Sequence, residues 1–491
     1  MAAKEPPSVR IERLLAAGDH VGAFAAAEEL LRVAPSSAIG RFGRARALLR
    51  MGNQVEAARD LDMALAASPK DEHVRLVKAK LDFRVGRTEL AILELRAIGR
   101  GKGPHAIDAA LNLLHALHYA GRYDELAEIV AEGGAWTGDP SAPLHRARVE
   151  ARIDREAAVA EFRAIFASSA PLSCRRDAAF DAVDHLDKLG RYREAFDLAK
   201  SAHALMPAAS DLEPWTGLME AQLMLLMQGV ERGSPHFRPR GERAPGTAFI
   251  VALPRSGTTL IEQMLDRHPE IGGIGEYDGI DNIRRGLFTT NYWPRNPNAI
   301  ADATYAALRT QYLAGAAQLR KAGATWTLDK SLQAFRALPE IAMLFPGAVC
   351  ISVDRDPRDT ATSLFLSHLN PNIYGWASNF NAIRRVIETQ RKVVPRALEM
   401  LGLTHERIVY ERLVEDPAGH AQRCLARMGL AMDERVLAPE GNTRTAATLS
   451  HAQVRQPINR KSIGRWKNYE WAFDASWNAL ADEHALRLSS D

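Results

Sequence analysis

Residues 247–268 read TAFIVALPRSGTTLIEQMLDRH, and this stretch sets the class of the second half of the chain. The run from Thr247 to Leu253 is short, apolar and partly β-branched, which predicts a buried strand. The residues after Thr259 have apolar side chains at helical spacing. A strand that passes through a tight loop into a helix points backbone N–H groups at one place, an arrangement that binds anions. We therefore predict an anion-binding loop at 254–259.

The residue types in this loop suit a phosphate or a sulfate group. Gly257 permits close approach of the backbone to a ligand, and Arg255 adds a fixed positive charge. Hydroxyl donors come from Ser256, Thr258 and Thr259. A nucleotide-hydrolysing P-loop has the pattern GxxxxGK[ST], but no lysine follows Gly257 and no glycine stands five positions before it. A kinase or NTPase is therefore the weaker interpretation.

A second strand followed by a charged turn occurs further along the chain. The run GAVCISV at 347–353 predicts another buried strand, and DRDPRD at 354–359 leads into the helical TATSLFLSHL. Arg355, Arg358 and Ser363 suit a phosphate held bidentately, although alone the arginines are more typical of surface ion pairs with the interleaved aspartates. Two anion loops after two strands suit a ligand that has two separated phosphates.

The first half of the chain has an internal period. Glycines recur at intervals of 34, 34 and 35 residues, with a further one about two periods later: Gly18, Gly52, Gly86, Gly121 and Gly190. Prolines keep nearly the same interval. This pattern resembles the tetratricopeptide repeat (TPR) over roughly residues 8–207 and predicts a solenoid of helix pairs. Two uses of the repeats stay open: a concave surface for a partner or substrate, and a scaffold or dimerisation element.

The sequence predicts three parts. An N-terminal TPR-like helical repeat solenoid occupies 1–207, and a helix and linker rich in Gly, Pro and Arg occupy 208–245. A P-loop-like α/β domain with a parallel sheet occupies 246–491. The fold class is thus α followed by α/β.

The amino-acid composition and net charge argue against several classes of protein. The 491 residues carry a net charge of only +3, which argues against a nucleic-acid binder with a broad basic surface. The sequence contains no apolar stretch of membrane-spanning length and no signal peptide, so we expect a cytoplasmic protein without a membrane partner. The spacing of Cys174, Cys350 and Cys424 indicates neither a zinc site nor a disulfide framework.

The segments LPRSGTTL and DRDPRDTATSLF together resemble the nucleotide-binding motifs of sulfotransferases that use 3′-phosphoadenosine 5′-phosphosulfate (PAPS). The resemblance covers about residues 246–470 and is closest to bacterial TPR sulfotransferases and the catalytic domain of protein-tyrosine sulfotransferases. It implies transfer of a sulfo group from PAPS to an acceptor hydroxyl, with PAP as the product and no metal. It also implies contacts to the 5′-phosphosulfate and to the 3′-phosphate. The 5′ group would be held by Arg255, Ser256, Gly257, Thr258 and Thr259, and the 3′ group by Arg355 and Ser363, with Tyr410 and Arg465 lining the nucleotide site.

The same resemblance implies the catalytic residues. Glu276, in GGIGEYDGI, matches a glutamate that serves as catalytic base, and Lys330, in WTLDKSL, matches a lysine at the leaving phosphate. His268 is a rival base, although it more plausibly ends the helix before Pro269. Two positions depart from the family pattern: His451 replaces a nucleotide-contacting serine, and Ser367 replaces an arginine.

Several alternatives stay open at the level of sequence. The polar segment 440–464 is either a loop that closes over the nucleotide or a static connector. The acceptor is a protein or peptide, a carbohydrate or a small molecule, and the repeats favour a protein slightly. The main competing hypothesis is a TPR interaction scaffold whose nucleotide-binding domain is catalytically idle.

Overall fold

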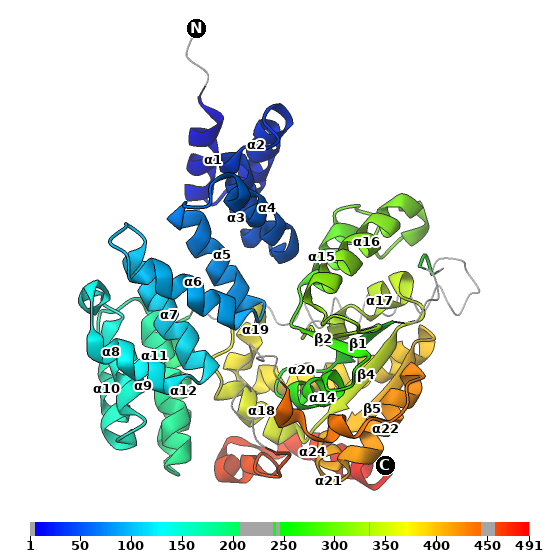
Figure 1. Ribbon diagram of the computed structural model, residues 1–491. Coiled ribbons are helices and arrows are strands. Elements are labelled where there is room, and N and C mark those ends of the chain that lie inside the picture. The colour runs from blue at the N-terminus through cyan, green and yellow to red at the C-terminus, as the bar shows by residue number, and fades with distance from the viewer. Residues whose placement is uncertain (1–4, 207–238, 242–245, 333, 443–456, 491) are drawn as a thin grey trace. The chain divides into compact units, whose positions relative to one another are not determined.

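The computed structural model describes residues 5–206, 239–241, 246–332, 334–442 and 457–490 (Figure 1). The chain divides into two compact units, Met1–Gly138 and Asp139–Asp491. The predicted linker at 208–245 lies almost entirely outside the described residues, as does most of the polar segment 440–464. The domain boundary at residue 207 therefore stays a prediction.

The first unit consists of paired helices, as the period predicts. Its helices are α1 (Pro7–Ala16), α2 (His20–Val33), α3 (Ala38–Arg50), α4 (Gln54–Ala67), α5 (Glu72–Arg84), α6 (Thr88–Gly99), α7 (Ala106–Ala120) and α8 (Tyr123–Glu132). Gly18, Gly52, Gly86 and Gly121 all have positive φ and lie in the turns between helices, a conformation that glycine adopts without a Cβ penalty. Ala57 and Ala64 on α4 are fully buried, so neighbouring helices approach closely there.

The second unit begins with four more repeat-like helices: α9 (Ala142–Glu150), α10 (Arg155–Ala167), α11 (Leu172–Lys188) and α12 (Tyr192–Ala204). Consecutive helices pack against each other. Gly190 has positive φ in the turn between α11 and α12. Asp154 caps α10 by accepting a hydrogen bond from the backbone N–H of Ala157, so a helix begins here without a turn glycine.

The rest of the second unit is built on a five-stranded parallel sheet with the order β2-β3-β1-β4-β5. The strands are β1 (Thr247–Val251), β2 (Ile271–Gly275), β3 (Trp326–Asp329), β4 (Val349–Asp354) and β5 (Thr404–Val409). The predicted strands at 247–253 and 347–353 correspond to β1 and β4 and are confirmed. The predicted fold class, helical repeats followed by a parallel α/β domain, is also confirmed.

Helices follow each strand of the sheet (Figure 1). They are α14 (Thr258–Asp266), α15 (Gly279–Phe288), α16 (Asp302–Leu319), α17 (Leu338–Leu344), α18 (Pro357–Phe365), α19 (Pro371–Tyr374), α20 (Phe380–Met400), α21 (Tyr410–Glu415), α22 (Pro417–Met428) and α24 (Asn478–Ser490). A 3-10 segment, η7 (Arg465–Ala472), lies in the C-terminal part.

Successive residues of β1 point to opposite faces of the sheet, so their contacts show which helices cover each face. Ala248 and Ile250 belong to an apolar cluster that includes side chains of α14 and α22. Phe249 packs on the other side, with its ring 5.9 Å from that of Tyr312 on α16. The sheet is thus covered on both faces, as buried parallel strands require, and α14 is held so that the loop before it lies at the carboxyl end of β1.

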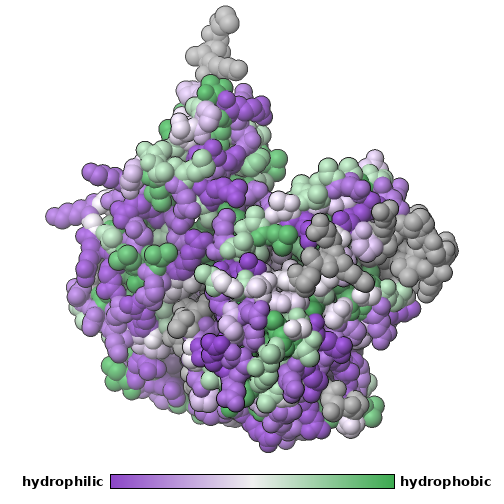
Figure 2. All heavy atoms as spheres, turned by 45° about the vertical axis from the view of Figure 1, so that its right-hand side comes forward, coloured by the Kyte–Doolittle hydropathy of each residue, from purple (hydrophilic) through white to green (hydrophobic). Residues whose placement is uncertain are grey.

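Figure 2 shows the side chains on one face of the molecule. The face drawn in Figure 2 is largely hydrophilic, with apolar side chains in small separate areas. Among the described helices, none combines the length and the apolar character needed to cross a bilayer. All three cysteines are buried and unbonded, and burial raises the pKa of the Cys350 thiol to about 12.

Candidate active site

The predicted site residues gather at the carboxyl ends of the parallel strands. The loop 254–257 follows β1, Glu276 follows β2, Lys330 follows β3, Arg355 follows β4, and Tyr410 follows β5. The connection from β1 leads to β2 at one edge of the sheet, whereas the connection from β4 leads to β5 at the other. The chain therefore diverges between β1 and β4, and ligands of open α/β sheets bind at such a point.

The loop between β1 and α14, which we call the first turn (residues 254–259), has an unusual backbone. Both Arg255 (φ 69°) and Gly257 (φ 98°) have positive φ. The hydroxyl residues Ser256, Thr258 and Thr259 are buried. A Cβ at position 257 would lie 2.3 Å from Cδ2 of Tyr410. Glycine is required here because the Tyr410 ring packs directly on the backbone of the first turn.

The second turn (residues 354–359) and the helix α18 that continues from it meet the first turn through two direct hydrogen bonds. The Nε of Arg255 donates to the Oγ of Ser363, at 2.8 Å. In the opposite direction, Nη1 of Arg355 donates to the backbone oxygen of Arg255, at 2.9 Å. The two turns, far apart in sequence, are thus in direct contact.

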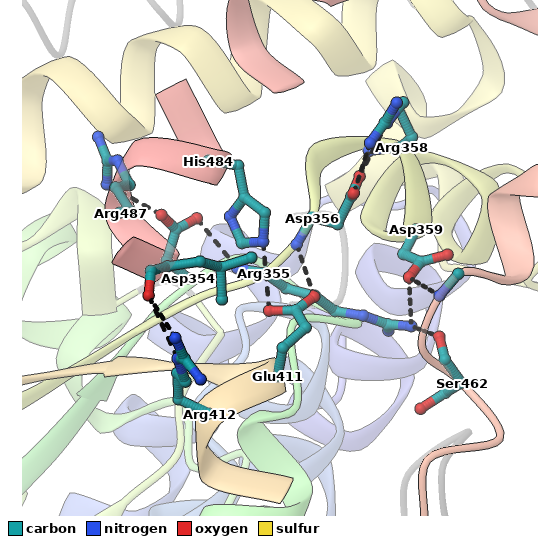
Figure 3. Close-up of polar contacts among 12 residues, drawn as sticks. Asp354, Arg355, Asp356, Arg358, Asp359, Glu411, Arg412, Ser462, His484 and Arg487 are labelled. Carbon is teal, nitrogen blue, oxygen red and sulfur yellow. Dashed lines mark hydrogen bonds and ion pairs between the residues drawn. The ribbon is translucent and has the colours of Figure 1, made fainter. Parts of the chain in front are cut away.

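Arg355 is the centre of this junction (Figure 3). Its guanidinium lies 4.9 Å from the centre of the Tyr410 ring and donates to the backbone oxygen of Ser462. Its Nη2 is also 3.8 Å from a carboxylate oxygen of Asp359. The hydroxyl of Tyr410 lies 2.7 Å from that of Ser462, so residues from β4, β5 and the C-terminal segment converge on one side chain.

Positive charges are concentrated at the junction. Burial, together with the neighbouring charges of Arg465 and Arg355, lowers the pKa of Arg255 to about 10. Like charges held close together in a buried place are costly unless an anion joins them. The electrostatics therefore fit a site for a phosphate or sulfate group.

Glu276 and Lys330 form an ion pair at the ends of the adjacent strands β2 and β3. The Lys330 Nζ lies 2.6 Å from Oε1 of Glu276, and the lysine side chain is only 1% exposed whereas the glutamate is 41% exposed. A buried ammonium requires a carboxylate partner, while the exposed carboxylate is accessible to a second molecule. The pair thus combines a buried cation with an exposed carboxylate.

Two regions of the chain are similar to known protein families. Residues 247–434 match the model of a sulfotransferase family, and residues 14–81 match a tetratricopeptide-repeat model. An uncharacterized protein of Aquifex aeolicus is 25% identical over 382 residues, which are 75% of this chain and 49% of that protein. Protein-tyrosine sulfotransferase 1 of Danio rerio is 27% identical over 236 residues, 44% of this chain and 64% of that protein.

The chain therefore spans about half to two thirds of the length of these relatives. Among solved structures, the sulfotransferase domain from the curacin biosynthetic pathway is 17% identical, with a TM-score of 0.36, over 50% of this chain and 99% of that one.

The structure distinguishes the two arginines of the second turn, Arg355 and Arg358, which the sequence does not. Arg358 pairs with Asp356 at 2.8 Å and lies 3.6 Å above the ring of Trp466, whereas Arg355 points to the first turn. Arg358 thus makes the predicted ion pair, whereas Arg355 faces the first turn and its role in anion binding stays a prediction. Figure 3 shows the two side chains pointing in different directions.

Asp354, at the end of β4, forms hydrogen bonds and ion pairs with residues of other elements. Its carboxylate accepts hydrogen bonds from Arg391 and Arg487, each at 2.9 Å, and from the backbone N–H of Arg355, at 3.0 Å. Arg391 also donates to the backbone oxygen of Arg355, at 3.0 Å. Asp354 therefore holds the second turn in place. Sequence reasoning missed both arginines because nothing local marks them.

Glu262 on α14 is a further residue that sequence reasoning missed. It is almost fully buried, accepts a hydrogen bond from the backbone N–H of Gly275 at 3.0 Å, and has Oε2 at 4.0 Å from the Lys330 Nζ. It thus connects the helix after the first turn to the end of β2 and to Lys330. The sequence signal that could have identified Glu262 is the presence of a glutamate within the apolar stripe of LIEQMLD.

The remaining predicted positions are placed as follows. His268 lies beyond the far end of α14 from the first turn, where its ring contacts the backbone oxygen of Ala431 and the backbone N–H of Glu270, each at 3.2 Å. Ser367 donates to the backbone oxygen of Ser363 at 2.6 Å. Arg465, in η7, pairs with Asp187 at 2.8 Å. His451 lies outside the described residues.

We expect Gly257→Ala to lower the free energy of unfolding by more than the ~1–3 kcal/mol that a strained positive φ costs, because the new methyl group also meets Tyr410. Chemical denaturation of both variants and the wild type measures this. Gly402→Ala is the matched control, since Gly402 has φ +63° but no atom within 4 Å of its added Cβ. Equal losses in the two variants would show that the contact with Tyr410 is unimportant.

Proposed function

We propose that the sulfotransferase domain transfers a sulfo group from PAPS to a hydroxyl group of an acceptor. The observation that carries the proposal is the junction of the two cationic turns through Arg255, Ser363 and Arg355. A nucleotide with phosphate groups at both its 5′ and 3′ ends has the charge and the separation of groups that two such turns suit. The Glu276–Lys330 pair at the same strand ends provides the acid–base groups.

In this proposal the first turn holds the 5′-phosphosulfate. Arg255 supplies charge, Gly257 permits close approach of the backbone, and the N-terminus of α14 together with the hydroxyls of Ser256, Thr258 and Thr259 supplies donors. Arg355 and Ser363 hold the 3′-phosphate, and Arg465 contributes a further charge. Tyr410, packed between the first turn and Arg355, lines the nucleotide site.

The chemical step balances without a metal. The acceptor oxygen forms a bond to sulfur as the bond from sulfur to the phosphate oxygen breaks, and Glu276 accepts the hydroxyl proton. Lys330 and Arg255 stabilise the negative charge that develops on the departing phosphate, so that positioning and electrostatics lower the barrier. Lys330 must turn from Glu276 toward that oxygen, and Glu262 remains beside it as a second carboxylate.

The acceptor is proposed only as a class: a hydroxyl of a protein or peptide, a carbohydrate or a small molecule. The exposed carboxylate of Glu276 makes the base accessible to any of these. The helical repeats support a protein acceptor or a protein partner, because stacked helix pairs present extended binding surfaces.

Isothermal titration calorimetry with PAP tests the donor. We expect saturable binding of one PAP per chain, because the phosphate turns are present before any acceptor binds. Incubation of the full chain with radiolabelled PAPS and fractionated cell lysate then tests transfer, and the labelled fraction identifies the acceptor class. Failure to bind PAP would favour the alternative, an interaction scaffold with an idle domain.

A further inference from the structure

Asp187, near the end of the repeat helix α11, contacts the C-terminal segment of the sulfotransferase domain. Its Oδ2 lies 2.8 Å from Nη2 of Arg465, and its Oδ1 accepts a hydrogen bond from the hydroxyl of Tyr469 at 2.5 Å. Each oxygen of one largely buried carboxylate thus serves a different residue of η7. The tyrosine contact fixes the orientation in which the carboxylate meets the arginine.

Packing around these contacts holds η7 from the side of the repeats. Tyr469 is fully buried, and its ring lies 5.4 Å from that of Tyr192 at the start of α12. Arg193 lies 4.1 Å above the ring of Trp471. The final pair of repeat helices is therefore part of the core that supports η7.

The second turn holds the start of η7 from the other side. A carboxylate of α18, Asp359, accepts hydrogen bonds from the backbone N–H groups of Gly464 and Trp466, at 2.7 and 2.8 Å. The same carboxylate is 3.8 Å from Arg355. Arg465 lies between these two backbone anchors, so its backbone is fixed to the second turn while its guanidinium is fixed to α11.

Arg465 belongs to the positive cluster at the junction of the two turns, because the residues on either side of it bond to Asp359, which lies 3.8 Å from Arg355. The charge of Arg465 also contributes to the lowered pKa of Arg255. A guanidinium has five N–H donors in a planar fork, so an ion pair at one terminal nitrogen leaves donors for a second anion. An arginine oriented before the ligand arrives loses less side-chain entropy when it binds.

We infer that Asp187 is a positioning residue for nucleotide binding, which holds the guanidinium of Arg465 toward the phosphate turns. The last repeat helices thereby form part of the nucleotide site rather than only a separate interaction module. This inference rests on the proposed function, because Arg465 is assigned to the nucleotide there. It assigns a role to Asp187, a repeat residue that lies outside both of the proposed phosphate-binding turns.

A double-mutant cycle with calorimetry of PAP on the full chain tests the inference. Asp187→Ala is expected to weaken PAP binding roughly tenfold, the effect of one charge-assisted contact. In an Arg465→Gln background the same change is expected to have little further effect, because the two residues act as one unit. Asp187→Asn, which keeps the shape and one acceptor oxygen, should give an intermediate loss.

Two further variants separate positioning from general destabilisation. Asp197→Ala removes a carboxylate from an exposed position on α12 and should leave PAP binding unchanged. Tyr469→Phe removes only the tyrosine contact to Asp187 and should weaken PAP binding less than Asp187→Ala, with thermal unfolding followed in every variant.

Unchanged or tighter PAP binding by Asp187→Ala would overturn the inference, as would a fully additive loss in the double variant. These outcomes presuppose a wild-type chain that binds PAP, and they leave the proposed function intact. A wild-type chain that binds no PAP would overturn the proposed function and the inference together.

Discussion

Replacement Glu276→Gln is expected to lower the rate of sulfo transfer by about 100- to 10,000-fold, the range typical of a lost general base, while PAP binding changes little. The amide has the shape of the carboxylate but cannot accept the acceptor proton. Glu276 lies at the exposed end of its ion pair with the buried Lys330, so the nucleotide contacts are not removed. Transfer from radiolabelled PAPS to the lysate fraction identified above measures the rate, and calorimetry measures PAP binding.

Glu399→Gln is the matched control for this experiment, because Glu399 is an exposed glutamate on α20. It should transfer at the wild-type rate. If Glu276→Gln lost PAP affinity as severely as it lost activity, the residue would be a nucleotide contact and not the base. An unchanged rate would exclude the base role directly.

Replacement Arg355→Gln is expected to weaken PAP binding by roughly 100-fold or more. The variant removes the guanidinium proposed to hold the 3′-phosphate and also the hydrogen bond to the backbone oxygen of Arg255. A hydrogen bond to a charged group contributes about 1.5–3 kcal/mol, and each 1.4 kcal/mol is about tenfold in affinity. Calorimetry with PAP measures the loss.

The neighbouring arginine of the same turn provides the sharpest control. Arg358→Gln should change PAP affinity far less, because its guanidinium is engaged by Asp356 and the ring of Trp466. Arg396→Gln, at an exposed position on α20, should have no effect. Equal losses from Arg355→Gln and Arg358→Gln would mean that the second turn binds anions only through its net charge.

Local sequence predicted the elements of this protein well. The helix pairs follow from the glycine period, since a positive φ at Gly18, Gly52 and Gly86 is a property of a single residue. The strands β1 and β4 follow from short apolar runs. The first turn follows from loop composition together with the strand and helix beside it, all within about twenty residues. Each of these features depends on residues that are close together in the chain, so it can be predicted directly from the sequence.

The roles of Glu276, Lys330 and Arg465 were predicted only through resemblance to a family, because their positions carry weak local signals. The structure places Glu276 and Lys330 in direct contact and adds Glu262 beside them. Their functional roles stay predictions that the variants above test.

Sequence by itself therefore determined the repeat period, the two buried strands and the cationic turns that follow them. Tertiary structure alone decided which arginine of the second turn faces the first turn, and that Arg391 and Arg487 pair with Asp354. It also decided that Glu262 lies beside Lys330 and that Asp187 of a repeat helix reaches Arg465. The physical reason is that side-chain pairing across long sequence separations depends on strand order and helix placement. Both are set by the burial of apolar faces over the whole domain, not by the residues that meet.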